Sequence, residues 1–151
     1  MGRMMTWMDK PRILIVDDDS EFASDLQVLL SSEFEVTTAP TTQRAWEILD
    51  EYRPHCLLLD LNMPQYFGEH STDEGFSFLA HLRSESAPRF AAGLPVIILT
   101  ARKETESVEM TQRLRISKHY CKPPDIKRLK ASIWSLVAGM ANHGMSEMTG
   151  S

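Results

Sequence analysis

Five polar residues stand where four short apolar runs of the sequence end. They are Asp17, Asp18, Asp60, Thr100 and Lys122. The runs before them are too short for stable helices and fit strands that are buried on both faces. Ligands of open α/β sheets bind just beyond the carboxyl ends of the strands. We therefore expect these five side chains to lie together at one edge of a sheet.

Phosphoryl transfer is the chemistry that such a group of side chains supports. Two carboxylates about 4 Å apart repel each other by roughly 4 kcal/mol at an effective dielectric constant near ~20, so three of them together require a cation. Oxygen ligands favour Mg²⁺, and a lysine with a hydroxyl completes a site for an anion on that metal. A carboxylate can act as the nucleophile and form an acyl phosphate. Asp17 and Asp60 are both candidates for that nucleophile.

Alternating strands and helices must position these residues. The apolar patterns predict five strands, at 12–16, 34–38, 56–59, 96–99 and 119–121. They also predict five helices, at 20–30, 41–52, 75–82, 104–116 and 126–139. This alternation predicts an α/β fold with a doubly wound, five-stranded parallel sheet in a single domain.

Composition limits the classes of partner and location. The net charge of the 151 residues is −5, and an acidic chain is a poor candidate for direct nucleic-acid binding. No apolar run is long enough to predict a membrane span. Cys56 and Cys121 are expected to be reduced, buried thiols, which indicates a cytoplasmic protein. Residues 1–10 are expected to form a flexible leader and residues 140–151 a disordered tail.

Four motifs resemble those of a known family. They read Ile-Val-Asp17-Asp18-Asp19, Leu-Asp60-Leu-Asn-Met63-Pro64, Ile-Leu-Thr100-Ala101 and Lys122-Pro123. In order and spacing they resemble the receiver domain of response regulators in two-component signalling, which is a chemotaxis-regulator-like domain. The resemblance covers about residues 11–139. It implies the flavodoxin-like strand order 2-1-3-4-5.

The resemblance implies a role for each residue around the phosphoacceptor. Asp60 would accept a phosphoryl group from a phosphohistidine on a sensor histidine kinase or a histidine phosphotransfer protein. Asp18 and Asp60 would bind Mg²⁺ (or Mn²⁺) directly, together with the backbone carbonyl of Asn62. Asp17 would act mainly through a metal-bound water. Asn62 and Arg102 would tune the rate of dephosphorylation.

The same resemblance implies a switch that reads the phosphoryl group. Lys122 would contact the phosphoryl oxygens. Thr100 and Ala101 would lie against them, with the Thr100 hydroxyl swinging in to donate a hydrogen bond. His119 stands at the position of the family's aromatic switch residue, three before the lysine. The peptide bond before Pro123 would be cis.

The sequence departs from the family pattern in four places. Gly75, which leads the expected third helix, follows Asp60 by more residues than the pattern has, so we expect an insertion at about 65–73. That insertion is either a tolerated surface loop or a lid that selects the kinase. The other departures are His119, the pair Arg115-Ile116 in place of Gly-Ala, and Pro124 in place of an aromatic residue.

These patterns predict a signalling switch, not an enzyme, apart from catalysis of its own phosphorylation and dephosphorylation. Its output face would be the fourth helix, fifth strand and fifth helix, which could also form a homodimer. Two alternatives stay open. One is a degenerate receiver that only docks proteins, and the other is a haloacid-dehalogenase-like phosphatase with Asp17 as nucleophile. The phosphatase would not predict Asp60 or Lys122-Pro123.

Overall fold

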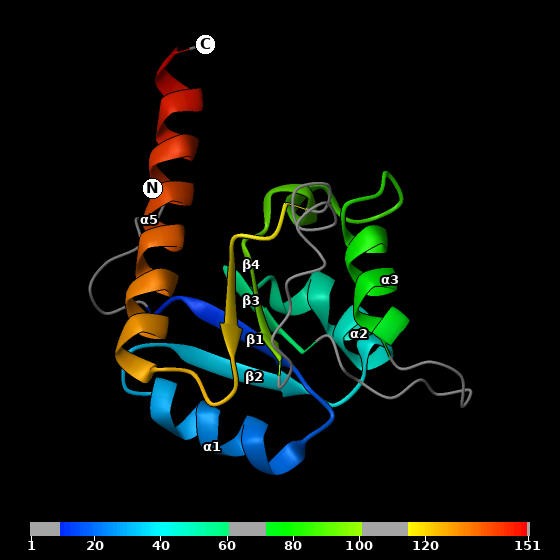
Figure 1. The fold of residues 1–151 in the computed structure, drawn as a ribbon. Coiled ribbons are helices and arrows are strands. Elements are labelled where there is room, and N and C mark those ends of the chain that lie inside the picture. Colours follow the sequence, from blue (N-terminus) through cyan, green and yellow to red (C-terminus); the bar gives the residue numbers. More distant parts are fainter. Residues whose placement is uncertain (1–9, 61–71, 101–114, 151) are drawn as a thin grey trace.

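The computed structural model describes residues 10–60, 72–100 and 115–150, and within these ranges the chain folds around one sheet (Figure 1). Its strands are β1 (Arg12–Val16), β2 (Glu35–Ala39), β3 (Cys56–Leu59), β4 (Val96–Thr100) and β5 (Lys118–Cys121). Neighbouring strands pair in parallel, in the order β2-β1-β3-β4-β5. The predicted doubly wound sheet and its strand order are confirmed.

Helices cover both faces of this sheet. They are α1 (Ser20–Leu30), α2 (Thr42–Tyr52), α3 (Thr72–Leu82) and α5 (Ile126–Gly150), with a short 3-10 helix, η1 (Arg89–Gly93), before β4. Helices α1 and α5 pack on one face, and α2 and α3 on the other (Figure 1). Among the residues described, no helix combines the length and the apolar character needed to cross a membrane.

Alternation of side chains along the strands divides the core into two layers. In β1, Leu14 and Val16 pack with α2 and α3, whereas Ile13 and Ile15 pack with α1 and α5. The described side chains of β3 and β4 are also buried throughout. A strand covered on both faces needs an apolar residue at every position, which explains why continuous apolar runs mark β1, β3 and β4 in the sequence.

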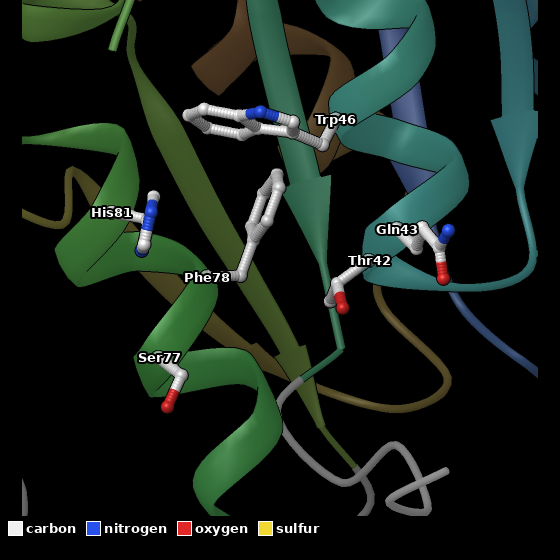
Figure 2. Close-up of a pocket in the computed structure, with 6 residues that line it drawn as sticks. All are labelled: Thr42, Gln43, Trp46, Ser77, Phe78 and His81. Atoms are coloured by element: carbon white, nitrogen blue, oxygen red, sulfur yellow. The ribbon is translucent and has the colours of Figure 1, made fainter. Parts of the chain in front are cut away.

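Three aromatic rings join α2 to α3 (Figure 2). The ring of Trp46 lies 6.1 Å from that of Phe78 and 5.4 Å from that of His81, at interplanar angles of 84° and 90°. Such edge-to-face contacts are a favoured geometry for aromatic pairs. The rings border a hollow of about 270 Å³, whose lining also includes Thr42, Gln43 and Ser77. Among the described residues, the lining contains no carboxylate, so these residues do not suggest a metal site.

A polar and aromatic contact joins α5 to the segment after α1. The ring of Trp134 on α5 packs against that of Phe34 in a tilted arrangement, with ring centroids 5.2 Å apart and an interplanar angle of 38°. Its indole Nε1 donates a hydrogen bond of 2.7 Å to Oε1 of Glu33, and Nζ of Lys130 lies 3.1 Å from the other oxygen of Glu33. The hydrogen bond from Trp134, followed by that from Lys130, lowers the pKa of Glu33. Helix α5 is thus joined to the segment after α1 by surface contacts as well as by the buried core.

Two helix boundaries differ from the predictions. Helix α3 begins at Thr72 instead of Gly75, since a helix tolerates an internal glycine at about 1 kcal/mol. Helix α5 continues to Gly150, so the predicted helix end at Gly139 and the predicted disordered tail are wrong. Ala141, Glu147 and the three methionines of that stretch favour a helix, and a helix tolerates the internal Gly144 at a cost of about 1 kcal/mol. In Figure 1 this part of α5 extends beyond the sheet.

Other expectations have mixed outcomes. Cys56 is buried as predicted, but Cys121 is exposed, because β5 is an edge strand with a neighbour on one side alone. The leader at 1–9, most of the insertion at 65–73 and most of the helix at 104–116 lie outside the described residues. The predictions for those segments therefore stay predictions.

The turn before β5 holds Arg115 in a left-handed conformation, with φ of 56°. This conformation suits glycine and is unfavourable for other L-residues by about 1–2 kcal/mol. Arg115 stands where the resemblance implies a glycine, so the backbone has glycine-like geometry despite the larger side chain. The Arg115 guanidinium donates to the carbonyl of Ala92 (3.2 Å), and the Arg115 carbonyl accepts from Nη2 of Arg83 (3.1 Å).

We predict that Arg115→Gly is more stable than Arg115→Ala by about 1 kcal/mol. Both variants lose the Arg115 side chain, but only glycine adopts the left-handed backbone conformation without a steric cost from a Cβ atom. Urea unfolding of both variants measures the difference. Ala80→Gly on the exposed face of α3 is the control and should lower stability by about 1 kcal/mol. Equal stability of the two Arg115 variants would contradict the assigned strain.

Candidate functional site

The register of the sheet brings three strand ends together. Strands β1 and β3 pair up to their last residues, so Asp17 and Asp60, which follow them, lie side by side. The N–H of Asp60 extends this ladder by donating to the carbonyl of Val16 (3.0 Å). The last residue of β5 pairs with the last residue of β4, and Lys122 comes next. The expected gathering of these side chains is therefore present.

The ammonium group of Lys122 binds both buried carboxylates. Its Nζ lies 2.8 Å from Oδ2 of Asp17 and 3.2 Å from Oδ2 of Asp60. Asp17 is 2% exposed and Asp60 is 5% exposed. Carboxylates buried to this degree require paired charges or hydrogen bonds. Lys122 thus balances part of the negative charge at the strand ends.

Asp18 adds a third carboxylate on the exposed side of the site. One carboxylate oxygen from each of Asp17, Asp18 and Asp60 lies within 4.8 Å of the others. Mg²⁺ is typically bound by one or two carboxylates and keeps several waters. Two buried carboxylates beside an exposed one provide both the protein oxygens and the access for water. The donor set therefore fits Mg²⁺ or Mn²⁺.

Burial and like charge shift the pKa values of these groups. Burial raises the pKa of Asp17 from 3.8 to about 6, although hydrogen bonds from Lys122 and from the backbone of Asp19 oppose the rise. Burial, followed by the charge of Asp60, raises the pKa of Asp18. Burial alone would lower the pKa of Lys122, but its contacts with Asp17 and Asp60 raise it. One lysine therefore leaves the three carboxylates short of positive charge.

The turn between β1 and α1 orients Asp17. The N–H of Asp19 donates to Oδ1 of Asp17 (2.9 Å). Asp19 is also the N-cap of α1, since its Oδ1 accepts from the N–H of Phe22 (3.0 Å). This hydrogen bond is the one that a capping aspartate makes, and the pair Asp19-Ser20 directly before the apolar periodicity of the helix predicts a cap at one of these two residues. The first turn of α1 is thereby fixed beside the site.

Sequence reasoning missed a contact made by Phe22. Its ring centroid lies 4.4 Å from Nζ of Lys122. In the sequence, Phe22 recurs with Leu26, Leu29 and Leu30 at helical spacing, and this periodicity predicts only that Phe22 lies on the apolar face of the helix. Its position in the first helical turn, directly after a strand end, was the signal that its ring could reach the site.

Several residues predicted to complete the site are described in part or not at all. Thr100 is the last residue of β4, at the same edge of the sheet as Asp60. Asn62, Ala101 and Arg102 lie outside the described residues. Their roles therefore stay predictions.

Strand β5 presents His119 and Tyr120 on opposite faces. Tyr120 packs against the layer of α1 and α5, where its hydroxyl lies 2.5 Å from Oγ of Ser132. His119 alternates to the other face and is exposed. The following peptide bond, between Lys122 and Pro123, is cis as expected. Tyr120 is therefore held by α5, and the switch role of His119 stays a prediction.

Comparison with known proteins gives one consistent family. The model of the response regulator receiver domain matches residues 13–134. Response regulator Rre1 of Synechocystis sp. is 31% identical over 128 residues, which are 83% of this chain and 51% of that protein. Transcriptional regulatory protein PrrA of Mycobacterium tuberculosis is 35% identical over 104 residues, which are 68% of this chain and 40% of that protein. The chain thus spans about half of these relatives or less.

Solved structures agree on the fold. The crystal structure of a CheY-like response regulator receiver domain protein from Methanospirillum hungatei JF-1 matches with a TM-score of 0.74 and 20% identity. The match covers 89% of this chain and 99% of that one. Likeness at this identity supports the five-stranded architecture, and the site itself has to be judged from its own residues.

The raised pKa of Asp17 predicts that Asp17→Asn stabilises the metal-free protein at neutral pH. Because the pKa of Asp17 is higher in the folded protein, folding favours the protonated carboxyl group. The stability that this group contributes is therefore fully present below pH 3.8 and is lost as the pH rises towards about 6. A pKa rise of this size corresponds to at most about 3 kcal/mol. We expect Asp17→Asn to gain about 1–3 kcal/mol at neutral pH and almost nothing near pH ~4.

Urea unfolding in the presence of EDTA at both pH values measures this effect. Added Mg²⁺ should raise the stability of the wild type more than that of Asp17→Asn, because the variant has lost one carboxylate of the metal site. A variant less stable than the wild type at neutral pH would contradict the assigned charge imbalance.

Proposed function

The chain belongs to the family of response regulator receiver domains of two-component signalling, and from this premise we propose that Asp60 accepts a phosphoryl group. The observation that carries the proposal is the position of Nζ of Lys122, 3.2 Å from Oδ2 of the buried Asp60. A lysine held there can bind an oxygen of a phosphoryl group attached to that carboxylate. The chain would then act as a phosphorylation-dependent switch.

The proposed step is an in-line displacement at phosphorus. A carboxylate oxygen of Asp60 attacks the phosphorus of a phosphohistidine on the donor protein. The P–N bond breaks, the histidine nitrogen takes up a proton, and an acyl phosphate forms on Asp60. Lys122 stabilises the negative charge on the transferred group. A divalent ion held by Asp17, Asp18 and Asp60 would add positive charge at the same oxygens.

Residues near the strand ends would complete the site. The backbone carbonyl of Asn62 would be a further metal ligand, and Thr100 and Ala101 would contact the phosphoryl oxygens. Asn62 and Arg102 would influence the access of water and so the rate of dephosphorylation. These assignments follow from the matching positions of the family.

The phosphoryl group would be read at β5 and α5. Lys122 directly follows β5, and Tyr120 of β5 reaches Ser132 of α5, so a shift of the lysine has a short route to that helix. His119, on the other face of β5, would be the switch residue. The donor would be a sensor histidine kinase or a histidine phosphotransfer protein in the cytoplasm. This face of β5 and α5 would be the docking or dimerisation surface.

The two alternative functions have less support from the site. In a haloacid-dehalogenase-like phosphatase Asp17 would be the nucleophile, yet both of its oxygens already have partners, the Asp19 N–H and Nζ of Lys122. A degenerate receiver would have no need of the three-carboxylate cluster beside a lysine. Phosphorylation by a small donor separates the three possibilities.

We predict that acetyl phosphate with Mg²⁺ adds one phosphoryl group to the wild-type protein and none to Asp60→Asn. Intact-mass spectrometry detects the adduct, and beryllofluoride should bind in its place. Asp50→Asn on the exposed face of α2 is a matched control and should be phosphorylated like the wild type. EDTA should suppress the reaction.

Each alternative function has its own signature in this assay. An adduct on Asp17 with phosphatase turnover would support the phosphatase. Absence of an adduct with acetyl phosphate, phosphoramidate and beryllofluoride would support the docking module and overturn the proposal.

A further inference from the structure

Lys122 has a contact that is not with an anion. Asp17 and Asp60 bind its ammonium group, and the ring centroid of Phe22 lies 4.4 Å from the same nitrogen. A cation within about 6 Å of the face of an aromatic ring is attracted by the ring's quadrupole, and more strongly when water is excluded. The Lys122 side chain is 15% exposed, so little water competes with the ring.

The turn that orients Asp17 also fixes Phe22. Oδ1 of Asp17 accepts the N–H of Asp19, and Oδ1 of Asp19 accepts the N–H of Phe22. The Phe22 ring contacts Lys122, and Lys122 returns to Oδ2 of Asp17. These four residues form a closed circuit of contacts. The backbone of Phe22 is therefore fixed by the same hydrogen bonds that place the carboxylate, and the Phe22 side chain packs against the layer of α1 and α5.

We propose that Phe22 is a positioning residue for Lys122, and that its ring keeps the ammonium group beside Asp60 when the charges around it change. The proposal rests on the proposed function, in which Lys122 contacts the phosphoryl group. A metal ion at the carboxylates would compete with Lys122 for Oδ2 of Asp17. The attraction of the ring needs no anion, so it remains when that ion pair weakens. Without the ring, the flexible lysine side chain turns towards water more often.

The test varies the charge distribution of the ring at nearly constant shape. Phenylalanine analogues with one, two and three ring fluorines at position 22 weaken the negative face of the ring step by step. The rate of Asp60 phosphorylation by acetyl phosphate at saturating Mg²⁺ should fall with each fluorine. We expect a loss of about threefold to tenfold for the most fluorinated ring and for Phe22→Leu. Phe22→Tyr keeps the ring face and should stay within about twofold of the wild type.

A second aromatic–cation pair provides the matched control. The guanidinium carbon of Arg53 lies 5.1 Å from the ring centroid of Phe90, away from the carboxylates. Phe90→Leu should leave the phosphorylation rate unchanged. A rate that does not change across the fluorinated series overturns the proposal, even if Phe22→Leu is slow, since that pattern indicates a role for shape alone.

A readout without phosphoryl transfer separates this proposal from the proposed function. The ring current of Phe22 should shift the NMR signals of the Lys122 methylene protons next to Nζ upfield in the metal-free protein. The shift should be lost in Phe22→Leu and retained in Phe22→Tyr. If the wild type takes up no phosphoryl group, the proposed function is refuted. The NMR shift would still show whether the ring of Phe22 holds the ammonium end of Lys122. Random-coil chemical shifts for these Lys122 methylene protons in the wild type would overturn the proposal.

Discussion

The ammonium group of Lys122 lies between two buried carboxylates, and the arrangement of the sheet serves to place it there. Asp17 and Asp60 follow adjacent central strands, where their charges would repel each other without a cation. Lys122 arrives from β5, the strand that closes the sheet on one edge. Three segments far apart in the sequence must therefore be ordered together before this charge is balanced.

One lysine does not balance the charge of three carboxylates. Burial raises the pKa of Asp17 to about 6, so we expect the metal-free site to be less stable than the same fold with a neutral residue at this position. Natural proteins commonly retain such local instability where they bind ligands. In this site the unbalanced charge of Asp17, Asp18 and Asp60 is compatible with binding of a divalent cation.

Residues with a single dominant environment were predictable from the sequence. Strands β1 and β3 were readable because both of their faces are buried, and Asp19 because a capping aspartate has a local hydrogen-bond pattern. The sequence predicted Phe22 only as a core residue. Helical periodicity indicates on which face of the helix a side chain lies, but not which charged group it contacts. Exposure of Cys121 depends on its edge position, and the length of α5 on weak propensities that the glycines obscured. The exposure of Cys121 is thus decided by the position of β5 in the sheet, whereas the length of α5 depends on small local propensities that are hard to weigh against its glycines.

Trp46 and Trp134 lie on opposite faces of the sheet. Trp46 contacts Phe78 and His81 in the layer of α2 and α3, and Trp134 packs against Phe34 in the layer of α1 and α5. Each helical layer therefore has its own intrinsic fluorophore, and Trp7 lies outside the described residues. With Trp7 and one of the pair replaced by phenylalanine, the emission of the remaining indole reports on one layer. Ordering of the two layers during refolding becomes separable by optical spectroscopy without any attached dye.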